Sequence, residues 1–185
     1  MDRKGSGLSH AAEYGHLSVV DLLLSFPTVD PEICDGHALR VAIDKGQLNV
    51  VKRLLADERV DPSGHDSFSL CMACSKGNIE VVRFLLADSR VNAAAVENYP
   101  LAISSEKGFA DVVEELLKRE EVDPCVEQNY CVRAAAAGGH EATVALLVKD
   151  VRVVGMYRRN WPQMAREQGH SVIARLLSNT SVDSE

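Results

Sequence analysis

Three features are missing from this 185-residue sequence: a membrane-spanning run, a secretion signal and a disulfide framework. No apolar run approaches the roughly 18 residues that a spanning helix needs, and the first eight residues are too polar for the core of a signal peptide. The five cysteines are odd in number and share no recurrent position, which favours free thiols in a reducing compartment. We therefore expect no membrane association and an intracellular location, in the cytoplasm, with the nucleus as the alternative.

Motifs of catalysis are also missing. The sequence has no glycine-rich phosphate loop, no serine–histidine–aspartate set and no pair of carboxylates that stands out for acid–base work. Cys71 and Cys74 have the spacing of a metal or redox pair, but zinc needs four ligands and no second cysteine pair exists. Packing inside a helix is the alternative role for these two residues. We expect no enzyme activity, no cofactor and no metal site.

An excess of basic residues is the third absence. The net charge is −7, the acidic excess lies in residues 1–127, and residues 128–185 are slightly basic. Binding to nucleic acid depends on neutralising phosphates with lysine and arginine, so this balance argues against it. The sequence predicts no nucleic-acid partner.

What the sequence does contain is one pattern, repeated about six times. A glycine opens the second half of each copy, four times at an interval of 31 residues and once at 30: Gly15, Gly46, Gly77, Gly108, Gly139 and, more loosely, Gly169. In the second copy a valine pair follows at 50–51 and a leucine pair at 54–55, and the neighbouring copies repeat both. A period of 20–50 residues indicates a solenoid, whose function is seldom catalytic.

Residues 36–66 illustrate one copy. The spacing of Leu39, Ala42 and Ile43 predicts a helix over 36–45, which Gly46 ends in a left-handed conformation. A second helix over 48–56 runs back, and Asp61-Pro62 closes the copy. The few residues that remain suit a tight turn or a β-like finger. Residues with N-capping side chains, or glycine, precede the first helices: Gly36, Ser67, Asn98, Asn129 and Asn160.

The segments 15–24, 46–55, 77–86 and 108–117 resemble ankyrin repeats. These copies are two residues shorter than the usual 33, and the typical Thr-Pro-Leu-His opening is replaced, for example by Tyr99-Pro100-Leu101-Ala102. The resemblance implies an all-α, ankyrin-type solenoid of about six helix-turn-helix repeats with short finger loops. It also implies a structural role for the histidines after the repeat glycines: His16, His140 and His170. We expect a single domain over residues 1–185, with repeats at approximately 5–35, 36–66, 67–97, 98–128, 129–159 and 160–185.

The resemblance further implies binding of another protein through the concave surface of finger tips and first helices. The predicted contact residues are Asp35, Asp66, Phe68, Glu97, Tyr99, Gln128, Tyr130, Arg158, Arg159 and Trp161. Five of the rings, starting with His37, recur every 31 residues, so a structural spine of stacked rings is the alternative for that column. Alternative functions are a structural spacer or assembly segment, or the substrate receptor of a larger protein. We expect a monomer, with end-to-end association as the other outcome.

Overall fold

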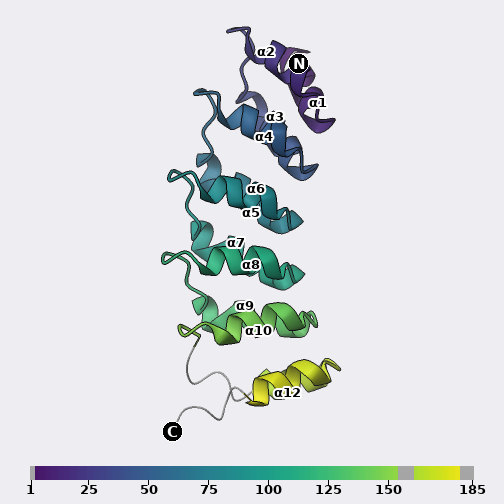
Figure 1. Cartoon of the computed structure of the whole chain (residues 1–185), viewed down its shortest axis with the longest axis vertical. Coiled ribbons are helices and arrows are strands. Elements are labelled where there is room, and N and C mark those ends of the chain that lie inside the picture. Colours follow the sequence, from purple (N-terminus) through teal and green to yellow (C-terminus); the bar gives the residue numbers. More distant parts are fainter. Residues whose placement is uncertain (1–2, 154–160, 180–185) are drawn as a thin grey trace. The chain divides into compact units, whose positions relative to one another are not determined.

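A computed structural model describes residues 3–153 and 161–179, and the side chains of 7–64, 67–153 and 161–178. Figure 1 shows helices that pair antiparallel, and the described ranges contain twelve helices and no strand. The predicted all-α repeat fold is therefore confirmed. Arg158, Arg159 and Asn160 lie outside the described residues, as do the side chains of His65 and Asp66.

The chain divides into two compact units, residues 1–92 and 93–185, each with three helix pairs. The first unit holds α1 (Arg3–Glu13), α2 (Leu17–Leu24), α3 (Ile33–Asp44), α4 (Leu48–Leu55), α5 (Gly64–Lys76) and α6 (Ile79–Leu86). The second holds α7 (Ala95–Lys107), α8 (Ala110–Leu117), α9 (Val126–Ala137), α10 (Glu141–Lys149), α11 (Trp161–Glu167) and α12 (Ser171–Asn179). Within each unit, the first helices of successive pairs contact one another, and so do the second helices. The single domain over 1–185 stays a prediction.

The second helices form the middle of each unit because their apolar residues cover more than one face. In α4, Val50, Val51 and Leu54 are at most 1% exposed. One stripe of an ordinary amphipathic helix would bury fewer of these residues, so the helix packs against its own partner and against neighbouring repeats. This arrangement places the first helices and the turns before them where grooves can form.

Each repeat glycine satisfies two constraints, which Gly108 illustrates. Its φ of +75° ends α7 in the left-handed region, and the N–H of Phe109 bonds the carbonyl of Ser104 at 3.0 Å. A Cβ at this position would also collide with the ring of His140 from the next repeat. That ring places Nε2 2.8 Å from the carbonyl oxygen of Glu106. His140 therefore has the predicted structural role, but its bond joins two repeats.

The short segment before each first helix is a left-handed turn, so the β-like finger is wrong and the tight turn is confirmed. Val96, Glu97 and Asn98 have φ values of 48°, 54° and 66°, and the N–H of Asn98 bonds the carbonyl of Ala94 at 3.1 Å. Residues 34–36 and 127–129 repeat this geometry. Each left-handed residue other than glycine costs about 1–2 kcal/mol, so packing between repeats must stabilise these turns.

The residues predicted as N-caps act on the following repeat instead. The Oδ1 atom of Asn98 accepts a hydrogen bond from the N–H of Asp123 at 2.8 Å, 25 residues along the chain. Ser67 does the same with the N–H of Asn92 at 3.2 Å. Both side chains are buried, with exposures of 8% and 3%. The physical reason is that a left-handed backbone turns the side chain away from its own helix and toward the next turn.

An Asp-x-Arg motif after the second helices joins repeats, and sequence reasoning missed it. Arg152 donates to the carbonyls of Val122 at 2.6 Å and Leu117 at 2.9 Å, while Asp150 accepts two of its N–H groups. The hydrogen bonds from Arg152 lower the pKa of Asp150. Arg59 bonds the preceding repeat in the same way. The recurrence of aspartate at 57, 88 and 150 was the available signal.

Candidate binding grooves

Each unit has one groove between the first helices of two adjacent repeats, next to the left-handed turns. The groove of the first unit, here the α3–α5 groove, has a volume of about 210 Å³. The groove of the second unit, the α7–α9 groove, has a volume of about 290 Å³. The turns bring residues just before the helices to the groove rim, because three left-handed residues redirect the chain within one turn.

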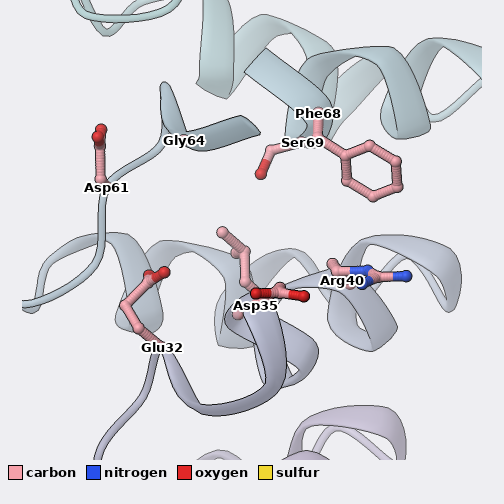
Figure 2. Close-up of a pocket in the computed structure, with 9 residues that line it drawn as sticks. Glu32, Asp35, Arg40, Asp61, Gly64, Phe68 and Ser69 are labelled. Carbon is pink, nitrogen blue, oxygen red and sulfur yellow. The ribbon is translucent and has the colours of Figure 1, made fainter. Parts of the chain in front are cut away.

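The α3–α5 groove carries both signs of charge. Figure 2 shows Glu32 and Asp61 at one end and Arg40 beside Phe68 at the other. The guanidinium carbon of Arg40 lies 5.0 Å from the centre of the Phe68 ring, a cation–π distance. A hydrogen bond from the Ser63 hydroxyl lowers the pKa of Asp61, which is therefore ionised at neutral pH. Arg40 also has a buried Nε without a hydrogen-bond partner.

The α7–α9 groove is apolar in its centre and acidic at its rim. Val96 and Tyr99 are 56% and 44% exposed, and Ile103 and Tyr130 continue the apolar lining. The carboxylates of Glu97, Glu106 and Glu127 line the same groove, and its lining contains no lysine or arginine.

A hydrogen bond fixes one wall of the α7–α9 groove. The hydroxyl of Tyr130 on α9 donates to Oε2 of Glu106 on α7 at 3.0 Å. This bond raises the pKa of Tyr130, because ionisation would break it and place two negative charges together. Arg133 lies over the outer face of the ring at 6.0 Å and donates to the carbonyl oxygen of Glu127 at 3.1 Å. Tyr130 is thereby held in place before any partner arrives.

The two grooves occupy corresponding positions, 62 residues apart in the sequence. Asp35 corresponds to Glu97, and Phe68 to Tyr130, so acid and ring recur. Arg40 corresponds to Ala102, and this difference removes the cation from the second groove. The same framework thus presents different side chains in each unit.

The structure places five of the predicted contact residues in these grooves. Asp35 and Phe68 line the α3–α5 groove, and Glu97, Tyr99 and Tyr130 line the α7–α9 groove. Gln128 is exposed but does not line a groove, and Trp161 is only 3% exposed, so its ring offers little surface. Which of these residues touch a partner stays a prediction.

Stacked rings are not what holds the aromatic column in the described residues. The ring pair in contact there is Tyr14 with His16, whereas Phe68 and Tyr130 each face an arginine. Sequence reasoning missed Arg40 and Ile103 as lining residues. The signal that could have found them is variation at a fixed repeat position, since Arg40, Cys71, Ala102 and Arg133 are spaced by 31 residues.

The cysteine pair that suggested a metal or redox site is buried in α5. Cys71 and Cys74 are 7% and 0% exposed, and burial raises the pKa of the Cys74 thiol. Their helix positions make them packing residues, and a thiol that stays protonated is a poor ligand. Within the described side chains, no three histidine, cysteine or acidic residues are grouped so that they could hold a metal ion. None of the described helices is long and apolar enough to cross a bilayer.

Comparisons with known proteins agree with this architecture. The family described as ankyrin repeats (three copies) matches residues 39–128 and 70–155. Among solved structures, the ankyrin repeat domain of human ASB11 is 20% identical with a TM-score of 0.74, covering 95% of this chain and 84% of that one. An ankyrin repeat domain from Acinetobacter baumannii is 19% identical with the same score, covering 94% and 97%. No curated protein matches the sequence.

Proposed function

The chain belongs to the ankyrin repeat family, and we propose that it binds a partner protein, without catalysis, through the grooves between its first helices. Ankyrin repeats are generally modules for protein–protein interaction. The observation that carries the proposal is the α7–α9 groove, where the large apolar residues Val96 and Tyr99 remain about half exposed beside the fixed ring of Tyr130. Exposed aromatic residues in a groove are the usual anchors of a protein interface.

The mechanism is recognition by a surface that is formed in advance. The bond between Tyr130 and Glu106 and the packed left-handed turns hold the groove residues in one arrangement. A partner therefore pays little entropy for ordering this side of the interface, and the affinity depends mainly on the groove's own contacts. The groove volumes, about 210 and 290 Å³, lie below the roughly 300–1,000 Å³ of small-molecule sites, which favours single side chains as occupants.

Substitution of the ring residues tests this function. We expect Tyr99→Ala and Tyr130→Ala to lose the proteins that the wild-type chain captures from its own cells, measured by quantitative mass spectrometry. Phe26→Ala is the matched control, because Phe26 is 50% exposed and lines neither groove. Thermal unfolding of all variants separates binding from stability. Capture of the same proteins by both tyrosine variants would contradict the proposal, and a collapse in stability would make the rings a structural spine.

End-to-end assembly is a second candidate function, favoured by the uncovered side of α2. Val19 is 43% exposed, whereas Val50 and Val81 at the same repeat position are 1% and 0% exposed. Those two are covered because α4 and α6 each follow another second helix. Light scattering over a range of concentrations tests this function, with Val19→Asp as the variant that should abolish any association. A strict monomer at all concentrations would rule it out.

We also infer an intracellular, cytoplasmic location, with the nucleus as the alternative. All five cysteines are free thiols, which suits a reducing compartment. Cys34 is exposed on a left-handed turn and would be oxidised readily outside the cell. Fractionation with antibody detection should find the chain in the cytosolic or nuclear fraction, and recovery from the medium would refute this inference.

A further inference from the structure

We propose that the α7–α9 groove binds a partner segment in which one large apolar side chain is flanked by lysine or arginine. This inference rests on the proposed function and names the chemistry of the partner. It depends on three properties of the groove: an apolar seat of limited size, carboxylates at both ends of that seat, and the absence of a cation from the groove lining.

The apolar seat runs along one face of α7. Tyr99, Ala102, Ile103 and Glu106 are spaced by three or four residues, so they lie in a row on the helix, and Tyr130 of α9 forms the opposite wall. Val96 adds exposed apolar surface at the turn end of this row. A volume of about 290 Å³ holds one large apolar side chain rather than a drug-sized ligand. Burying such a side chain supplies the main affinity, about 1.5–3 kcal/mol.

The acidic residues lie at the two ends of this seat. Glu97 and Glu127 are on the left-handed turns where α7 and α9 begin, and Glu106 is at the last turn of α7. All three are exposed. Glu106 already accepts a bond from Tyr130, which leaves its charge uncompensated because a phenol is neutral. A basic residue on either side of the apolar anchor would therefore find a carboxylate.

The nearest cation that the structure describes does not neutralise this rim. Arg133 lies over Tyr130 and directs a guanidinium N–H to the backbone carbonyl of Glu127, and no ion pair joins it to a carboxylate of the groove. In the α3–α5 groove the corresponding position of the lining is occupied by Arg40. A basic segment would meet repulsion there. The charge pattern thus directs such a segment to the second unit.

Selection from a random library of displayed 12-residue peptides, with the full-length chain as bait, tests the proposal. We expect enrichment of peptides in which leucine, isoleucine, phenylalanine or tyrosine is flanked by lysine or arginine. Synthetic copies of the enriched peptides would then be titrated by fluorescence polarisation. Glu97→Gln combined with Glu127→Gln should weaken binding about three- to tenfold at low salt, and less at 0.5 M salt, because exposed ion pairs are weak and screened.

Two further variants locate the site. Tyr99→Ala should weaken binding about tenfold or more, since it removes a wall of the seat. Phe68→Ala, in the other groove, is the matched control and should leave the peptide affinity unchanged. Enrichment of acidic or neutral peptides, or binding that ignores the glutamine substitutions, would overturn this inference. If such peptides still depend on Phe68 or Tyr99, the proposed function stands and only the partner chemistry is wrong. A selection that enriches no peptide also overturns the inference, and the capture experiment then decides the proposed function independently.

Discussion

Asn98 should reveal how much the left-handed turns cost and what stabilises them. It combines a φ of 66° with a buried side chain, whose Oδ1 accepts the N–H of Asp123 at 2.8 Å. Three substitutions separate these two contributions. Asn98→Asp keeps the acceptor, Asn98→Gly keeps the ease of a positive φ but loses the bond, and Asn98→Ala loses both.

The magnitudes follow from each lost term. An intramolecular hydrogen bond contributes about 1 kcal/mol, and its loss leaves a partly buried N–H without a partner. The left-handed conformation costs alanine about 1 kcal/mol more than asparagine. We therefore expect destabilisation of about 2 kcal/mol for Asn98→Ala, about 1 kcal/mol for Asn98→Gly and close to zero for Asn98→Asp. For a chain of this length, 1 kcal/mol lowers the melting temperature by about 2–4 °C.

Thermal and urea unfolding, followed by circular dichroism, measure this series. Equal losses for glycine and alanine would refute the role of the left-handed conformation, because only alanine carries that cost. A loss for Asn98→Asp as large as that for Asn98→Gly would refute the hydrogen bond between the repeats. Ser105→Ala is a useful control, since its hydroxyl is buried without a hydrogen-bond partner.

The remaining predictions concern thiol reactivity and pH. Cys34 is exposed, whereas burial raises the pKa of the Cys131 thiol to about 11, so iodoacetamide at pH 7.5 should alkylate Cys34 first and leave Cys131 unmodified in the folded chain. Equal rates, measured by mass spectrometry of peptides, would contradict this. Arg152 lowers the folded-state pKa of Asp150, so the carboxylate stabilises the fold above the ordinary aspartate pKa of about 3.9, and this contribution is lost as the pH falls through the lower folded value. The stability advantage of the wild type over Asp150→Asn should therefore be full at pH 6 and smaller at pH 3 in urea unfolding, and a pH-independent difference would refute the assignment.

Part of the candidate site could be predicted because it lies at regular positions. Tyr99 and Tyr130 recur at the same place in each repeat, so periodicity alone brought them to one surface. Arg40 and Ile103 could not be found this way, because whether a residue lines a groove depends on the neighbouring repeat. Trp161 shows the same limit, since its position in the pattern matches Tyr130 but its ring is buried.

The sequence by itself determined the helix pairs and their ends. The 31-residue period sets one helix pair per copy, and Gly46 and Gly108 end the first helices because few other residues adopt a positive φ without strain. The tertiary structure alone decided the left-handed turns, where Val96 adopts a conformation that its branched side chain disfavours locally. It also decided the bonds from Asn98 and Arg152 to neighbouring repeats. Local preferences act within a few residues, whereas these features depend on contacts between segments about 25–35 residues apart.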